Sequence, residues 1–194
     1  MAVRIFIASL LSAAVMMVWG FVFWGLSGMP SEFMRPLPGG ETVAAVLTEN
    51  VLETGVYFHP FQPDDMANAV AMEDFRDQHR RGPIFFLAYV RQGSEPMPPS
   101  MYLFGYLQMF AVSLVAAILL ALAAPRLSNF LARWLFVALV GVLVAVVNLS
   151  DAIWFHHPWS FRMMLAGSAA ISWLLAGLPL AAIVRAAASD AEPL

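Results

Sequence analysis

The chain has no cysteine and no lysine, and each absence removes a class of chemistry. Without cysteine there is no disulfide, no thiolate nucleophile and no cysteine ligand for zinc or an iron–sulfur cluster. Without lysine there is no Schiff base and no phosphate-binding P-loop lysine. Charge is also scarce, since only 12% of the 194 residues are charged, and the net charge of −3 disfavours nucleic acid as a partner.

Hydrophobic residues dominate the composition instead. They account for 61% of the chain, and the mean hydropathy is +0.75, whereas soluble domains are about 45–50% apolar. This composition predicts an integral membrane protein in contact with the lipid bilayer.

Four apolar stretches are each long enough to cross a bilayer, which takes about 20 helical residues. They cover residues 5–27, 102–124, 130–150 and 164–186, and ionisable groups occur only near their ends. The first stretch could instead be a signal peptide. We favour a membrane anchor, because the apolar run of this stretch is longer than the apolar region of a signal peptide, which has about 7–15 residues, and because no clear cleavage site follows.

The arginines beside these stretches indicate the orientation, because positive residues in short loops stay in the cytoplasm. Arg4, Arg126, Arg133 and Arg185 all fall on one side of the membrane if the N-terminus is cytoplasmic. The sequence therefore predicts a multi-pass protein of the bacterial inner membrane with both termini in the cytoplasm. Residues 29–101, which carry ten acidic residues against five arginines, are then outside.

Residues 29–101 are too long for a simple loop and carry signals of regular structure. Apolar spacing and turn residues predict helix, strand, helix and strand over residues 41–53, 56–58, 63–81 and 84–90. We expect the helices to cover a two-stranded ribbon. Two strands are rarely stable alone, so this cap should rest on the membrane helices or on a partner.

The predicted fold is therefore mainly α. It is a four-helix polytopic membrane protein with a small extracytoplasmic α+β cap inserted between the first and second transmembrane helices. The predicted domains are a first transmembrane helix over residues 1–28, the acidic cap over residues 29–101 and a three-helix transmembrane region over residues 102–194.

The histidines are the candidate metal ligands. His156 and His157 lie at the outer end of the third span, and His59 and His79 could join them in an external site. Adjacent side chains on a regular element point about 100° or 180° apart, so His156 and His157 share one ion only in an irregular turn. The competing interpretation is an interfacial loop of amphipathic anchors. The sequence predicts no cofactor and leaves contact with haem, copper or a pigment open.

No catalytic motif accompanies these residues, since the chain has no nucleophile elbow and no glycine-rich phosphate loop. Transporters and channels place ionisable groups inside the membrane, whereas these four stretches carry them only near their ends. We therefore expect a protein that is neither an enzyme nor a transporter.

Our leading hypothesis is a non-catalytic accessory, structural or assembly subunit of a larger bacterial inner-membrane complex, respiratory or photosynthetic in kind. Its partners would be other integral membrane subunits, contacted by aromatic and arginine side chains of the cap. The candidate contacts are Tyr57, Phe61, Arg76, Arg80, Arg81 and Arg91. Two alternatives stay open: a metal- or haem-binding membrane redox protein that uses His156 and His157, and a lipid- or small-molecule-binding module with an apolar pocket under residues 97–106.

Overall fold

A computed structural model describes residues 1–186 of the chain, and most of them are helical. Contacts divide the chain into two compact units. Of the described residues, the four-helix unit contains residues 1–35, 97–150 and 158–186. The inserted unit contains residues 36–96 together with residues 151–157.

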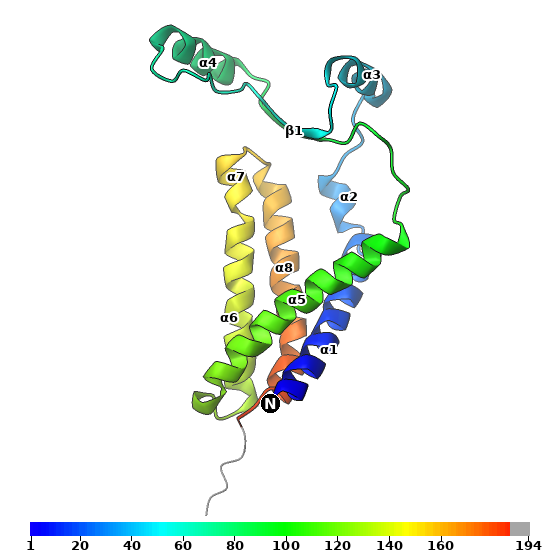
Figure 1. Ribbon diagram of the computed structural model, residues 1–194, viewed down its shortest axis with the longest axis vertical. Coiled ribbons are helices and arrows are strands. Elements are labelled where there is room, and N and C mark those ends of the chain that lie inside the picture. Colours follow the sequence, from blue (N-terminus) through cyan, green and yellow to red (C-terminus); the bar gives the residue numbers. More distant parts are fainter. Residues whose placement is uncertain (187–194) are drawn as a thin grey trace, which may run out of the picture. The chain divides into compact units, whose positions relative to one another are not determined.

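Four long apolar helices build the four-helix unit (Figure 1). They are α1 (Ala2–Phe21), which the π-helical turn η1 (Val22–Leu26) extends, α5 (Pro99–Ala123), α6 (Phe130–Asn148) and α8 (Trp159–Ile183). Short elements flank them: α2 (Met29–Phe33) and η2 (Ala124–Arg126). Helix α7 (Ser150–Trp154) follows α6, and all but its first residue belongs to the inserted unit. With the turns that extend them, the four are long and apolar enough to cross a membrane. By length and composition, the prediction of a mainly helical protein with four membrane spans is confirmed.

Three of these helices begin earlier than the stretches predicted from the sequence, and α1 does so by starting at Ala2 rather than residue 5. Helix α5 starts at Pro99 rather than residue 102, and α8 starts at Trp159 rather than residue 164. Proline suits the first turn of a helix, because its missing N–H would find no partner there. Helix α8 follows Pro158 directly and takes Arg162 into its beginning, so counting only uncharged residues places its start too late.

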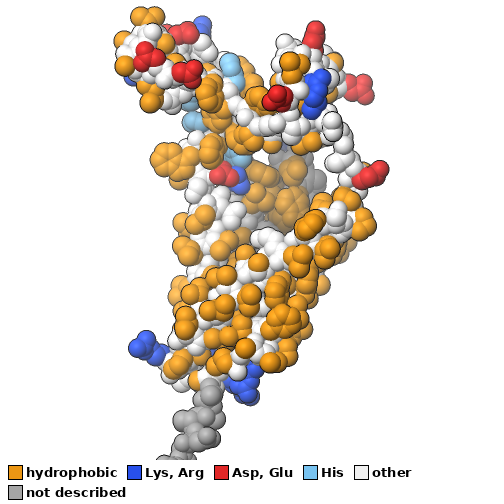
Figure 2. All heavy atoms as spheres, viewed as in Figure 1, with side chains coloured by type: hydrophobic (Ala, Val, Ile, Leu, Met, Phe, Trp, Pro, Cys, Tyr) orange, Lys and Arg blue, Asp and Glu red, His pale blue; other side chains and the backbone are white. Residues whose placement is uncertain are grey.

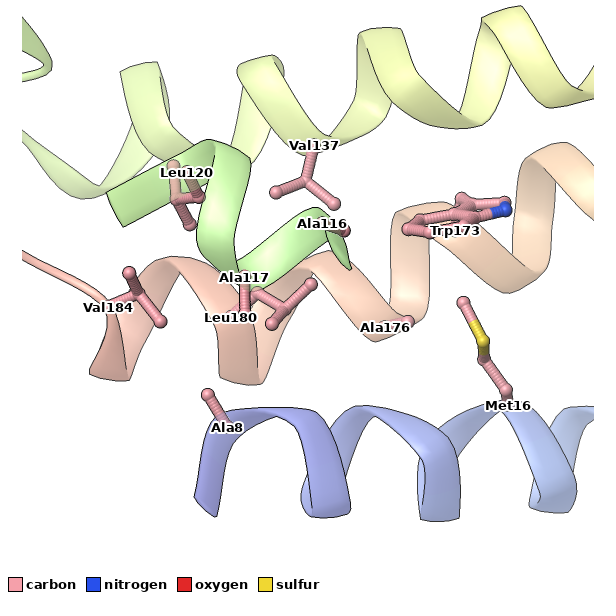
Figure 3. Close-up of a cluster of buried hydrophobic side chains, with 10 residues drawn as sticks. All are labelled: Ala8, Met16, Ala116, Ala117, Leu120, Val137, Trp173, Ala176, Leu180 and Val184. Atoms are coloured by element: carbon pink, nitrogen blue, oxygen red, sulfur yellow. The ribbon is translucent and has the colours of Figure 1, made fainter. Parts of the chain in front are cut away.

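Helix α8 packs against both α6 and α1, and α5 packs against α1. Figure 3 shows the side chains buried where these helices meet: Ala8, Met16, Ala116, Ala117, Leu120, Val137, Trp173, Ala176, Leu180 and Val184. Several are alanine, and small residues let helices approach closely in a membrane. The approach is very close at Gly141 on α6, where an added Cβ would lie 2.4 Å from the Trp173 Cβ on α8.

Polar side chains inside this unit bond to neighbouring helices. The Ser12 hydroxyl donates to the Ala176 carbonyl at 2.9 Å and so joins α1 to α8. The Trp19 indole donates to the carbonyl and hydroxyl oxygens of Ser168, both at 3.1 Å. A polar group without a partner is costly in hydrocarbon, so these bonds favour one arrangement of the helices.

The inserted unit follows the predicted order of helix, strand, helix and strand. Its elements are α3 (Gly40–Asn50), β1 (Gly55–His59), α4 (Ala69–Arg81) and β2 (Phe85–Tyr89). The strands form an antiparallel ribbon in which Tyr57 lies opposite Leu87 and Phe58 opposite Phe86. Figure 2 shows acidic side chains gathered on α3 and α4, while hydrophobic side chains cover the long helices of the other unit.

The helices of the inserted unit do not cover the ribbon, so the expectation of a two-layer cap is wrong. Helices α3 and α4 lie towards opposite ends of the ribbon (Figure 1), and neither packs along its face. Among the described residues of this unit, the buried ones are Pro60 and Ala152. The second half of α4 is dominated by charged residues, so this helix lacks an apolar stripe wide enough to seal a sheet.

Candidate functional site

A cavity of about 640 Å³ lies within the inserted unit. Strand β1, the chain from residue 60 to 66, helix α4 and residues 154–156 line it. Its walls are rich in aromatic side chains, with Tyr57, Phe61 and Trp154 among them, and His79 and His156 add polar groups. Small-molecule sites in proteins have volumes of about 300–1,000 Å³ and a similar mixture of apolar walls and a few polar groups.

Three phenylalanines hold the walls of this cavity together. Phe58 and Phe86 face each other across the ribbon with ring centroids 6.2 Å apart. Phe155 lies 5.6 Å from the Phe86 ring and 6.4 Å from the Phe58 ring. Offset or edge-on aromatic pairs at such distances stabilise by about 0.5–1.5 kcal/mol beyond the area they bury. The triad therefore ties residues 151–157, which the sequence assigned to a turn between two spans, to the ribbon.

The histidines take separate places around this cluster. The His79 and His156 rings meet edge to face at 5.2 Å, whereas His59 stacks on Phe85 and His157 lies against Phe86. His156 lies in the turn after α7 with φ 55, in the left-handed region that few residues other than glycine adopt.

The predicted metal ligands are therefore distributed over different neighbours. The structure places the His79 ring beside the His156 ring. The rings of His156 and His157 contact different partners, because the His157 ring lies against Phe86. Within residues 1–186, no three His, Asp or Glu side chains gather closely enough to hold a metal ion. A metal bound by His59, His156 and His157 stays a prediction that this arrangement does not favour.

Two of the arginines predicted to contact a partner are paired on their own helix. On the exposed surface of α4, Glu73 accepts hydrogen bonds from Arg76 and Arg80, both at 3.1 Å, and Asp77 accepts one from Arg80 at 2.9 Å. The bond from Arg76, followed by the bond from Arg80, holds the pKa of Glu73 below its ordinary value. Exposed ion pairs of this kind contribute little stability. They do neutralise the arginines locally.

Arg91, another predicted contact, has a role inside the unit. Its guanidinium donates to the carbonyl of Thr48 at 2.9 Å and to that of Val51 at 2.7 Å. These carbonyls lie at the C-terminal end of α3, which leaves backbone acceptors without helical partners. Arg91 thus anchors α3 to the chain that leaves β2.

The remaining predicted partner contacts are Arg81, Tyr57 and Phe61, and they differ in the bonds that their side chains make within the unit. Arg81 donates to the Asp77 carbonyl at 3.3 Å within α4. The Tyr57 hydroxyl donates to the Glu53 carbonyl at 2.9 Å. Phe61 leaves 75% of its surface exposed. Phe61 is therefore the predicted contact that is most available to another molecule.

A second, apolar groove lies within the four-helix unit, between α1 with η1 and α5. It has a volume of about 420 Å³, and Met17, Trp24 and Met101 are among the residues that line it. A Cβ added at Gly20 or Gly105 would meet nothing within 4 Å, so these glycines border open space. The binding-module alternative requires a buried apolar pocket under residues 97–106. Met97, Met101, Tyr102 and Gly105 line this groove, but it lies between two long helices.

Comparisons of the chain with protein-family models, with curated proteins and with solved structures found no match.

Proposed function

We propose that the chain is a non-catalytic accessory or assembly subunit of a larger bacterial inner-membrane complex, and that the inserted unit is an extracytoplasmic cap that binds a partner protein. The observation that supports this proposal is the small amount of burial in the inserted unit. Its described part buries Pro60 and Ala152, while large apolar side chains such as Phe61 and Trp154 stay 75% and 74% exposed.

A unit with so few buried side chains lacks the hydrophobic core that normally stabilises a folded domain. A domain of about 60 residues is already marginal when it buries a normal share of its surface, and a two-stranded ribbon contributes little on its own. Contiguous exposed apolar surface is typical of a binding interface, where aromatic side chains act as anchors. The aromatic walls around Phe61 have this character.

Site-specific photocrosslinking tests the proposal. A photoreactive amino acid replaces Phe61 in one variant and Glu95 in a matched control, both in the inserted unit, and the full chain is irradiated in its native membranes. We expect the Phe61 variant to link to one other membrane protein in high yield and the Glu95 variant to link to it weakly. A chain that links to nothing at either position and purifies as a lone monomer would contradict the proposal.

The groove between α1 and α5 favours a second candidate, a module that binds a lipid or a similar apolar molecule. Its lining is almost entirely apolar, and the glycines leave room for a guest chain. Gly105→Leu would fill the groove, and Gly167→Leu, at another glycine whose Cβ position is open, serves as the control. Native mass spectrometry should show a bound lipid that Gly105→Leu alone displaces, and equal lipid retention in both variants would eliminate this candidate.

A further inference from the structure

Helix α5 carries an exposed seam with the spacing of a heptad repeat. Its members follow one another at alternating intervals of four and three residues: Phe104, Gln108, Ala111, Val115, Ile118 and Leu122. All six are exposed, with Phe104, Val115 and Leu122 retaining 67%, 59% and 75% of their surface. The opposite face of α5 is the one that is buried, through residues such as Ala117 and Leu120. A seam of this spacing is the pattern by which two helices pair along their length.

Gln108 is the polar member of this seam. It lies nine residues into α5, about 14 Å from the helix start at the usual rise per residue, and the flanking positions are apolar. Within residues 1–186 its amide makes no hydrogen bond, in contrast to Ser12 and Trp19, which bond to neighbouring helices. An amide that faces hydrocarbon without a partner is unfavourable, and amides are among the groups that join membrane helices.

We propose that α5 is a dimerisation helix, with its seam packed against the α5 seam of a second copy and Gln108 hydrogen-bonded to the partner's Gln108. Copies in one membrane share their orientation, so the two α5 helices run parallel. In a parallel pair, equivalent positions of the repeat face each other. A carboxamide both donates and accepts, so two copies of Gln108 satisfy one another.

The surface beside the seam leaves space for such a partner. Ala111 and Val115 border a groove of about 350 Å³ whose other wall includes Val140 and Val144 of α6. Ala111 is small, which allows two backbones to approach. Paired membrane helices cross at about 20°, the same sense as in a coiled coil, so one heptad seam can stay in contact along its length. Dimerisation through α5 is independent of what the inserted unit binds.

The natural lack of cysteine makes disulfide crosslinking a clean first test. Ala111→Cys and Val115→Cys place a thiol on the seam, and Leu139→Cys and Leu143→Cys place one on α6 at side chains that are 67% and 64% exposed. After oxidation of the full chain in native membranes, we expect disulfide-linked dimers from the two α5 variants and not from the two α6 variants. Equal crosslinking on both helices, or none on α5, would overturn the proposal.

Substitution of Gln108 provides the second test. The dimerisation constant is measured by energy transfer between labelled copies in liposomes. Interhelical hydrogen bonds in membranes contribute about 0.6–2 kcal/mol, so Gln108→Leu should weaken association about 3- to 30-fold, while Gln108→Asn keeps most of it. Leucine is the more apolar residue and does not hinder insertion. An unchanged constant, or photocrosslinks from α5 to a different protein without any dimer, would contradict pairing through Gln108.

Discussion

At the scale of single residues, two helices approach each other most closely where one of them carries a glycine, which has no side chain. Gly141 lets α6 meet α8, since a Cβ there would lie 2.4 Å from the Trp173 Cβ. The obstructing atom is next to the α8 backbone, so it cannot move aside as the end of a flexible side chain would. The sequence of α6 alone does not show that Gly141 is in contact, because that depends on which helix packs against it.

We therefore predict that Gly141→Ala destabilises the protein. Inserting a methyl group into a well-packed contact costs about 1–3 kcal/mol, and the gain in helix propensity of about 1 kcal/mol offsets only part of it. The matched control is Gly167→Ala on α8, where an added Cβ meets nothing within 4 Å. Thermal unfolding in detergent should show a lower Tm for Gly141→Ala alone, and an equal Tm for both variants would contradict the close contact.

The histidines illustrate the same limit of sequence reasoning. The spacing of His79 and His156 along the chain carries no signal of proximity, because they come from α4 and from the turn after α7. Their rings meet where Phe155 packs against Phe58 and Phe86 of the ribbon and so brings residues 151–157 next to the inserted helix and strands. Gln108 was overlooked for another reason, since a search of the spans for ionisable groups passes over an uncharged amide.

At the scale of elements, the inserted unit is held together by specific bonds more than by a core. Its helix α3 has no buried residue, and the guanidinium of Arg91 binds two carbonyls at its C-terminal end. The sequence predicted the helices and strands of this unit in the right order, because local signals determine them. It did not predict how they are arranged, because that depends on contacts between elements.

The role of Arg91 can be tested by substitution. Arg91→Ala should loosen the end of α3, since charge-assisted hydrogen bonds contribute about 1.5–3 kcal/mol when intact. Hydrogen exchange should therefore become faster in residues 47–51 and at the nearby end of the ribbon. Arg35→Ala is the control, because within residues 1–186 the Arg35 side chain makes no hydrogen bond. Unchanged exchange in Arg91→Ala would show that the anchor contributes nothing.

At the scale of the whole molecule, the distribution of arginine predicts the topology. We predict that Arg4, Arg126 and Arg133 lie on the cytoplasmic side and that residues 29–101 lie on the other, because positive residues in short loops stay in the cytoplasm. A reporter that is active only outside the cytoplasm should therefore work when fused at Asp74, and a cytoplasmic reporter should work between α5 and α6. The opposite result at both positions would reverse the proposed orientation.

The sequence by itself determined the properties that depend on composition and on runs of neighbouring residues. These are the four apolar helices, the charge imbalance of the inserted segment and the order of its short helices and strands. The tertiary structure decided which side chains are left exposed, since burial depends on contacts between distant segments. Only that arrangement distinguishes Ala117, packed inside the four-helix unit, from Gln108 and Val115 on the exposed seam of the same helix.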